Sequence, residues 1–287
     1  MLAALFALLS AALFAGNSVA VRVALPGTTA TTMTVVSILT NLTSLWALAA
    51  LRGEAGAALQ PASLIFIGAG IMAPALARVA LYTAIDMVGV ARAVVTSNTT
   101  PLFTAVGAAL LLGERVSVGL AAGTVAVVLG VALASGTASP RVPRASRRGF
   151  LLALATAILA AVSILLRKVG LEAIPYPALA AALTLSGAVL GLVPLVVWRW
   201  RREPFRAART AVPPMLAGAL LTSGGFLAYF FALHLGNASR VTPLSNTTPL
   251  FAVLLLRFAF SDVEQVTRRT LLGAALTVAG ILLVVGM

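Results

Sequence analysis

Long apolar runs recur along the whole chain and limit what it can fold into. Runs of roughly 18 to 23 apolar residues follow one another, and each can cross a hydrocarbon core about 30 Å thick at about 1.5 Å per residue. Only 9% of the 287 residues are charged, and 61% are hydrophobic. A soluble domain carries about 25% charged residues. We therefore expect an all-α integral membrane protein whose surroundings are the lipid bilayer.

Turn residues divide these runs into ten predicted transmembrane helices. Pro26-Gly27, Gly113-Glu114 and Pro213-Pro214 are typical of the breaks between them. The predicted helices cover residues 2–24, 32–51, 62–85, 90–112, 117–136, 149–170, 177–198, 212–234, 239–260 and 269–286. A Pro- and Arg-rich linker, residues 137–148, separates a first five-helix repeat, residues 1–136, from a second, residues 149–287.

A duplicated phrase indicates that the two halves are copies of one unit. The sequence Ser-Asn-Thr-Thr-Pro-Leu-Phe occurs at residues 97–103 and again at residues 245–251, inside an apolar run each time. Because each half has an odd number of predicted helices, the second half must enter the membrane from the opposite side. The sequence thus predicts two inverted five-helix repeats around a central cavity, with a polar site on their pseudo-symmetry axis.

The region that follows the first phrase resembles a known family. Residues 100–105, Thr-Pro-Leu-Phe-Thr-Ala, run on to residues 110–115, Leu-Leu-Leu-Gly-Glu-Arg, and residues 248–262 are a weaker second copy. This is similar to the EamA-type ten-helix branch of the drug/metabolite transporter superfamily. The resemblance implies a carrier of amino acids, nucleotide sugars, phosphorylated sugars or lipophilic drugs, and many such carriers are exporters. Many relatives have a glutamate before the proline, where this chain has Thr100 and Thr248.

The basic residues predict the orientation. Loops after odd-numbered predicted helices hold thirteen Lys or Arg residues, and loops after even-numbered ones hold five. Because cytoplasmic loops are richer in Lys and Arg, the linker should be cytoplasmic and both termini outside. Members of the resembled family often have cytoplasmic termini instead. This distribution explains the net charge of +13 without a nucleic acid partner, and we expect a multi-pass protein of the cell inner (plasma) membrane.

The duplicated phrases are the first candidates for a substrate site. Both lie about 10–15 Å from a predicted helix start, near the middle of the membrane. Proline has no N–H, so Pro101 and Pro249 should each free a carbonyl group and kink a helix. The alternative is that the polar groups only join helices. The candidate substrate-binding residues in the two phrases are Ser97, Asn98, Thr100, Ser245, Asn246 and Thr248.

Four further residues are candidates for the same site. Arg78 should lie about 10 Å inside the core, where an arginine is costly and suggests function, although it could also extend toward Asp86 at the helix end. Tyr82 is one helical turn away on the same face. Tyr229 lies on the corresponding helix of the second repeat, and Asn17 is an isolated amide in the first helix. Aromatic rings on a cavity would suit planar or amphipathic solutes. The alternatives are that the tyrosines lie at the lipid interface and that Asn17 is structural.

The remaining residue types narrow the function. All seven carboxylates fall at predicted helix ends or in loops, whereas proton-coupled carriers generally need an acid near the midplane. With no cysteine and one histidine, neither a cofactor nor a metal is expected, and a membrane enzyme or a channel is less favoured. We expect a secondary carrier of small metabolites, amino acids or similar polar or amphipathic solutes, that works by alternating access in export or facilitated exchange. The alternative is a proton-coupled multidrug exporter.

Small residues predict how the halves associate. Gly119 and Gly123 share one face of the fifth predicted helix, and Gly273 and Gly280 lie on the tenth. Such faces allow helices to approach closely. We expect them to pack the two halves inside one chain, so that the protein works as a monomer; homodimerisation is the alternative.

Overall fold

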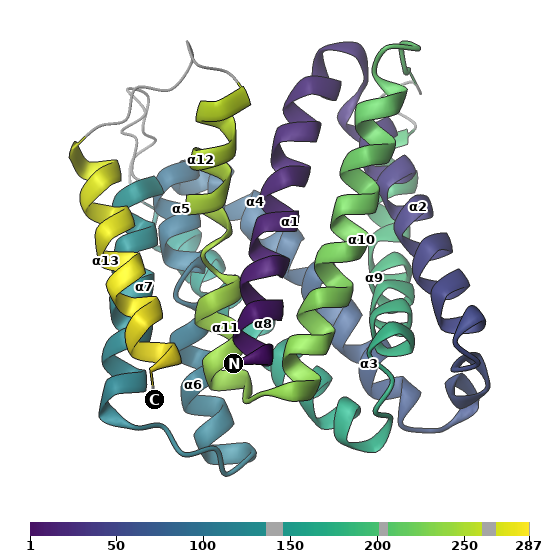
Figure 1. Ribbon diagram of the computed structural model, residues 1–287. Helices are drawn as coiled ribbons and strands as arrows, with labels where there is room; N and C mark the ends of the chain where they lie inside the picture. The colour runs from purple at the N-terminus through teal and green to yellow at the C-terminus, as the bar shows by residue number, and fades with distance from the viewer. Residues whose placement is uncertain (136–145, 201–205, 260–267, 287) are drawn as a thin grey trace.

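The computed structural model describes residues 1–135, 146–200, 206–259 and 268–286, and the regular elements within these ranges are helices (Figure 1). The α-helices are α1 Leu2–Ala24, α2 Ala30–Leu51, α3 Ser63–Gly70, α4 Ala77–Val88, α5 Val90–Ser97, α6 Thr100–Leu111, α7 Val118–Ser135, α8 Arg147–Ala173, α9 Pro177–Trp200, α10 Val212–Leu235, α11 Ala238–Ser245, α12 Thr248–Ala259 and α13 Arg268–Val285. Three short helical segments are η1 Leu25–Gly27, η2 Ala55–Leu59 and the π-helical η3 Ile71–Leu76.

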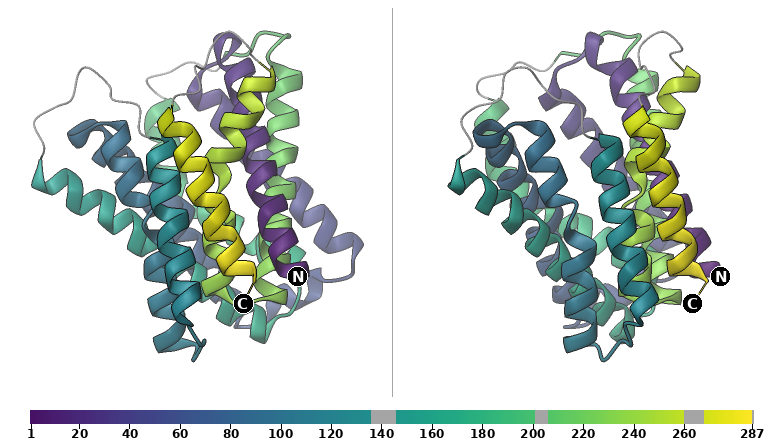
Figure 2. Two further views of the ribbon diagram at one scale, coloured as in Figure 1. Left: turned by 60° about the vertical axis from the view of Figure 1, so that its left-hand side comes forward. Right: turned by 90° about the vertical axis from the view of Figure 1, so that its left-hand side faces the viewer.

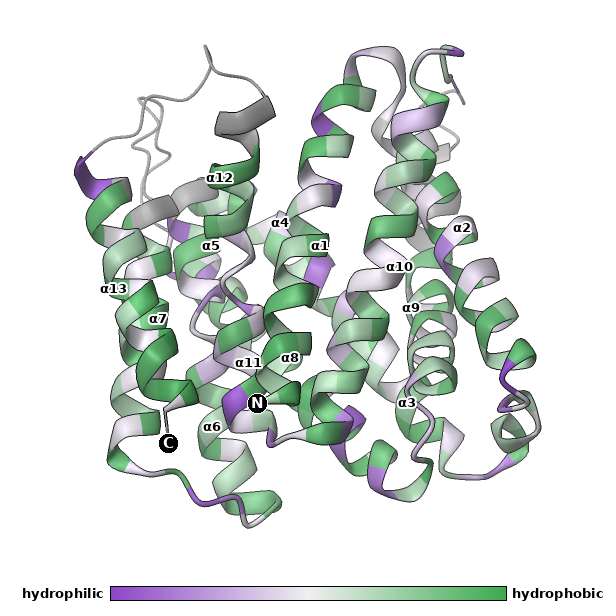
Figure 3. Cartoon of the chain, viewed as in Figure 1, coloured by the Kyte–Doolittle hydropathy of each residue, from purple (hydrophilic) through white to green (hydrophobic). Residues whose placement is uncertain are grey.

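Six helical segments among the described residues are long and apolar enough to cross a membrane. They are Leu2–Gly27, Thr31–Leu51, Ser63–Val88, Arg92–Leu111, Arg147–Ala173 and Val212–Leu235. Parts of α7, α9 and α13 are shorter apolar helices. Hydrophobic residues cover most of the helix surfaces, and hydrophilic ones gather mainly at helix ends and loops (Figure 3). The all-helical membrane fold is confirmed, and the count of ten spans stays a prediction.

The helices form one bundle in which both chain ends lie at the same end (Figures 1 and 2). The N-terminal α1 packs along α10 of the second half, and α7 packs along the C-terminal α13. A Cβ atom on Gly123 would lie 2.9 Å from the Gly280 carbonyl oxygen, and one on Gly280 would lie 2.7 Å from the Gly123 oxygen. These two glycines thus bring the last helix of each half into close contact within one chain.

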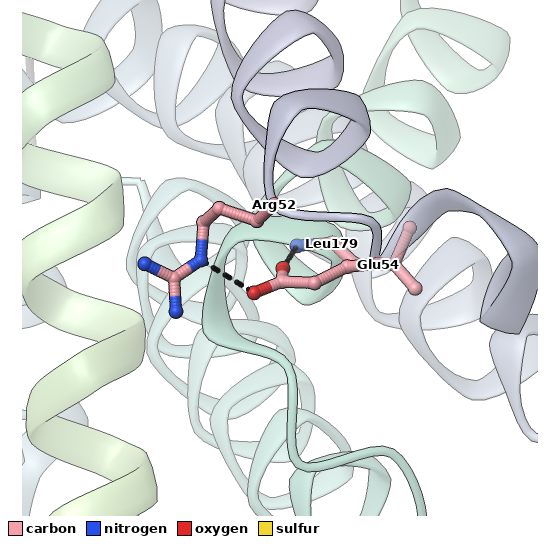
Figure 4. Close-up of polar contacts among 3 residues, drawn as sticks. All are labelled: Arg52, Glu54 and Leu179. Atoms are coloured by element: carbon pink, nitrogen blue, oxygen red, sulfur yellow. Dashed lines mark hydrogen bonds and ion pairs between the residues drawn. The ribbon is translucent and has the colours of Figure 1, made fainter.

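A carboxylate from the first half caps a helix of the second half (Figure 4). Glu54 follows α2 and is 5% exposed, and its Oε2 accepts a hydrogen bond of 3.3 Å from the Leu179 N–H in the first turn of α9. Its Oε1 lies 2.6 Å from Arg52 Nε. A negative charge at a helix N-terminus satisfies free N–H groups and complements the helix dipole. This contact ties the end of α2 to the start of α9.

At the other end of the bundle, backbone groups of the second half contact the start of α2. The Thr29 N–H, just before α2, donates to the Arg206 carbonyl at 3.3 Å, and the Ala208 N–H donates to the Gly27 carbonyl at 2.8 Å. The start of α2 and the start of α9 lie at opposite ends of the molecule (Figure 1). Each half therefore holds the N-terminus of the other half's second helix, and the inversion of the repeats stays a prediction.

The helix expected over residues 62–85 is interrupted, because Pro74 lacks an N–H and Ala73 has extended backbone angles of φ −147° and ψ 128°. The interruption, η3, separates α3 from α4. Side chains of α8 contact the carbonyl groups left free. Ser163 Oγ lies 2.7 Å from the Ala69 oxygen and 3.1 Å from the Ala73 oxygen, and Arg167 Nη2 also donates to Ala73. The sequence analysis missed this break.

Candidate functional site

A cavity of about 530 Å³ lies between helices of both halves. It begins at Leu25 and Met33, beside the turn between α1 and α2, and ends near the middle of the bundle at Asn41 and Phe226. It therefore occupies the half of the bundle that lies away from the chain termini (Figure 1). Its polar lining residues are Asn17, Thr34, Ser37, Asn41, Arg78, Tyr82, Thr156 and Thr222.

The deep end of the cavity is held by a polar cluster across the two halves. Asn41 is 4% exposed, and its Oδ1 accepts a hydrogen bond of 2.9 Å from Ser223 Oγ of α10. Its Nδ2 donates to Ser37 Oγ at 3.4 Å, and Ser44 Oγ lies 2.8 Å from Ser223 Oγ. A buried amide with partners on both sides keeps a fixed orientation. Asn41 can thus present a polar group to a solute while it joins α2 to α10.

Arg78 and Tyr82 lie one turn apart on α4 and both line the cavity. Both side chains are exposed. Within the described residues, the Arg78 side chain forms neither an ion pair nor a hydrogen bond. The described cavity lining includes Arg78 and no carboxylate. A cation with no carboxylate beside it gives this cavity a positive potential, which favours an anionic or zwitterionic solute.

The duplicated phrases form matching breaks in two helices. Helix α5 ends at Ser97 and α6 begins at Thr100; in the second half α11 ends at Ser245 and α12 begins at Thr248. The Thr100 hydroxyl donates to the Ser97 carbonyl at 2.8 Å, and the Thr248 hydroxyl donates to the Ser245 carbonyl at 2.9 Å. The threonine before each proline therefore satisfies the carbonyl group that the proline frees. The Thr100 and Thr248 side chains therefore serve the breaks themselves. The Ser97 hydroxyl instead donates to Val94, and the Ser245 hydroxyl donates to Ala7 of α1.

The two breaks meet each other inside the bundle. Asn246 Nδ2 donates to the backbone oxygen of Asn98 at 3.2 Å, and Asn98 Nδ2 is buried without a partner among the described residues. Pro101 is the second residue of α6, and Pro249 has the same place in α12, where a missing N–H costs little. None of these four residues lines the cavity described above. The paired asparagines connect the halves, and their binding role stays a prediction.

Both halves of the chain match one protein family. Residues 1–136 and 147–286 each match the EamA-like transporter family. The chain belongs to this family. It is therefore a multi-pass membrane protein that transports small solutes, and EamA-like proteins are transporters rather than enzymes.

Comparison with solved structures gives the same fold. A protein described only as "Crystal structure of protein" matches over 98% of this chain and 95% of its own, with a TM-score of 0.80 and 18% sequence identity. At this identity the likeness concerns the fold alone. Comparison with curated protein sequences gives no significant match.

In this EamA-like chain, the glutamate that ends the family-like segment has a structural role. The Glu114 carboxylate accepts hydrogen bonds from the N–H groups of Ala238 at 2.8 Å and Ser239 at 3.0 Å, and from the Ser239 hydroxyl. It therefore caps the N-terminus of α11 and joins the first half to the second. The sequence analysis treated it only as an acid at a helix end. Its counterpart, Asp262, lies outside the described residues.

The half of the transporter nearest the chain termini is closely packed. Tyr229, predicted to bind substrate, is 7% exposed there and lies outside the cavity lining. Its neighbour Phe230 is fully buried, 6.4 Å from the Phe66 ring centre to centre. Trp46 Nε1 donates to Ser186 Oγ at 3.1 Å across the halves. The bundle thus has an open half, which holds the cavity, and a closed half.

Arg167 corrects the count of basic loop residues. The sequence analysis counted it with the loop residues, although the predicted helix over residues 149–170 contains it. It lies inside α8, is 6% exposed and has its guanidinium carbon 5.6 Å from the centre of the Phe230 ring. One signal did mark it: Ser18 to Arg22 and Ser163 to Arg167 have the same spacing in the two halves. The other residues missed, Thr34, Ser37, Thr156 and Thr222, are hydroxyls of a kind common in membrane helices, which gave no signal.

Proposed function

We propose that this transporter is a secondary carrier that moves small metabolites, amino acids or similar polar or amphipathic solutes, by alternating access. The observation that supports this proposal best is a cavity that is open in one half of the bundle and closed in the other. Ser44 and Ser223 join the halves directly below its deep end, at 2.8 Å. A channel would need a continuous path, whereas a carrier exposes its site to one side at a time.

The cavity residues suggest how a solute is held. A volume of about 530 Å³ suits a molecule of metabolite size. In our proposal Arg78 pairs with a carboxylate group, Asn17 and Asn41 offer amide groups, and Tyr82 supplies an aromatic wall. All four come from one chain, which is consistent with a working monomer. Asn98 and Asn246 then act mainly as a joint about which the halves move.

The predicted orientation suggests which side of the membrane the cavity faces. The open end lies on the same side as the predicted cytoplasmic loops, opposite the chain termini. Without the buried Arg167 the predicted loop count is thirteen to four, and in our proposal this bias still sets the orientation in the plasma membrane. The conformation would then face the cytoplasm, ready to load a solute for export or exchange.

Two acids that cap helices bear on the alternative, a proton-coupled multidrug exporter. Glu54 and Glu114 cap α9 and α11 outside the described cavity lining, so neither is placed to exchange a proton with cargo. A cationic drug would also meet the positive potential of Arg78. We therefore favour exchange or facilitated movement, in which the solute gradient alone drives transport.

Counterflow in liposomes tests the proposal. Purified protein in liposomes loaded with unlabelled amino acid should accumulate the same labelled amino acid, from a panel of neutral and acidic ones, with saturation. Ser37→Trp, which fills the cavity, should abolish this flux. Leu39→Trp, two residues along α2 at a side chain 56% exposed, should leave it nearly unchanged. Flux of an organic cation that stops with a protonophore would instead establish the alternative.

A further inference from the structure

A second arginine lies buried below the cavity. Arg167 is 6% exposed, and within the described residues it forms no ion pair with a carboxylate. Its Nη2 donates to the Ala73 carbonyl, but its Nε is buried without a hydrogen-bond partner. The nearby Tyr229 hydroxyl, which faces Thr242, is also buried without a hydrogen bond of normal geometry. Two unsatisfied polar groups therefore share one closed core.

The Ala73-Pro74 peptide separates the Arg167 guanidinium from the cavity. Pro74 lines the cavity, and the carbonyl of the preceding residue, Ala73, accepts the hydrogen bond from Arg167. On its other side, Arg167 packs against the Phe230 ring, next to Tyr229. Arg167 thus lies between the open half and the closed half, one layer deeper than Arg78.

Support of the backbone accounts for only part of this arginine, because Nη2 donates to Ala73 and Nε has no partner among the described residues. Ser163 Oγ already lies within hydrogen-bond distance of both the Ala69 and the Ala73 carbonyl oxygens, at 2.7 and 3.1 Å. An unneutralised cation in a membrane core is expensive and usually marks a solute path. An unpaired Nε adds to that cost. A buried guanidinium with an unpaired Nε is therefore suited to an anion.

We propose that Arg167 and Tyr229 form a second carboxylate-binding site, which opens toward the chain termini when the cavity at Arg78 closes. This inference rests on the proposed carrier function. The cargo carboxylate leaves Arg78 and Tyr82 and pairs with the guanidinium of Arg167, whose Nε and one Nη form the planar fork that fits a carboxylate. The Tyr229 hydroxyl donates a further hydrogen bond to it. The cargo class is thus a small carboxylate-bearing solute.

Cysteine labelling tests the site without a known substrate. The chain has no cysteine, so one introduced cysteine is unique. The labelling rate of Tyr229→Cys is measured in the full chain in detergent with an anionic and with a cationic methanethiosulfonate, and each rate is divided by that reagent's rate with a free thiol. The anionic reagent should then be about tenfold faster, because Arg167 attracts it. Arg167→Gln should remove the preference for the anionic reagent. Lys168→Gln is the matched control and should preserve it, because the Lys168 ammonium instead donates to the Leu233 and Gly236 carbonyls at the end of α10.

Two controls separate the possible failures. Ser37→Cys in the cavity should react in every variant; if it does not, the carrier cavity itself is refuted. If Ser37→Cys reacts and Tyr229→Cys does not, only the second site is refuted, because Tyr229 is then permanent core. If Arg167→Gln does not fold, a competition experiment on Tyr229→Cys tests the site instead. Acetate should slow the labelling of this cysteine severalfold, and acetamide should not. Equal protection by chloride would refute a carboxylate site.

Discussion

The crossing of α3 and α9 allows one substitution to be compared with a matched control. A Cβ atom on Gly70 would overlap the Thr184 carbonyl oxygen and lie 2.8 Å from the Ala188 nitrogen, both backbone atoms of α9. A Cβ on Gly68, in the same helix, would meet nothing within 4 Å. The obstacle at Gly70 is main chain and cannot rotate away. Gly70→Ala must therefore push the two helices apart, and Gly68→Ala need not.

The expected difference follows directly from this comparison. Each substitution gains up to about 1 kcal/mol of helix propensity, so that contribution cancels between the two variants. What remains is the cost of overpacking, typically about 1–3 kcal/mol. We expect Gly68→Ala to be neutral or stabilising and Gly70→Ala to be less stable than it by this amount. Because α3 leads into Pro74 at the cavity, Gly70→Ala should also reduce counterflow.

Thermal unfolding in detergent, followed by tryptophan fluorescence, would measure the difference. Both variants should be monodisperse at low temperature, so that the midpoints compare folded proteins. Equal unfolding midpoints for Gly70→Ala and Gly68→Ala would refute the close crossing of α3 and α9. A lower midpoint for Gly70→Ala with unchanged counterflow would refute only its connection to transport.

Three further predictions concern side chains of the site and the joints. Arg78→Gln should weaken carboxylate transport at least tenfold but leave a neutral amide solute unaffected, as counterflow would show. Glu114→Gln should cost about 1–2 kcal/mol by weakening the α11 cap, whereas Glu172→Gln, at an exposed end of α8, should not; unfolding midpoints decide. Asn98→Ala and Asn246→Ala should lower the unfolding midpoint if the asparagines form a joint. If they bind cargo, the variants should instead lower solute affinity, and the double variant should depart from additivity by a coupling energy of about 0.5–3 kcal/mol.

Much of the fold could be predicted because it depends on local sequence. The apolar runs predicted membrane helices, and the two copies of the Ser-Asn-Thr-Thr-Pro phrase predicted a duplication with a weak point in each copy. At both copies the helix is broken, and the threonine before the proline satisfies the freed carbonyl. The break at Pro74 has no second copy in the other half, so repetition could not mark it.

The cavity was harder to predict, because it depends on which half of the bundle is open. Asn17, Arg78 and Tyr82 were expected in the site and do line it together. Tyr229 was expected beside them but lies in the closed half, although its sequence position matches that of Tyr82 to within one residue. Inverted repeats place equivalent residues on opposite sides of the midplane. Only one member of such a pair can face a cavity that is open to one side.

The reciprocal helix caps suggest why one half can open while the other closes. Glu54 fixes the start of α9 at the end of the bundle near the termini, and Arg206 and Ala208 fix the start of α2 at the opposite end. The second helix of each half is therefore anchored to the other half. Helix α3 and the interruption at Pro74 pack against α9, with the Ser163 and Arg167 side chains at the interruption. An interrupted helix beside an anchored one is where a tilt costs least, and it carries Arg78 on one side of the break and contacts Arg167 at the break itself.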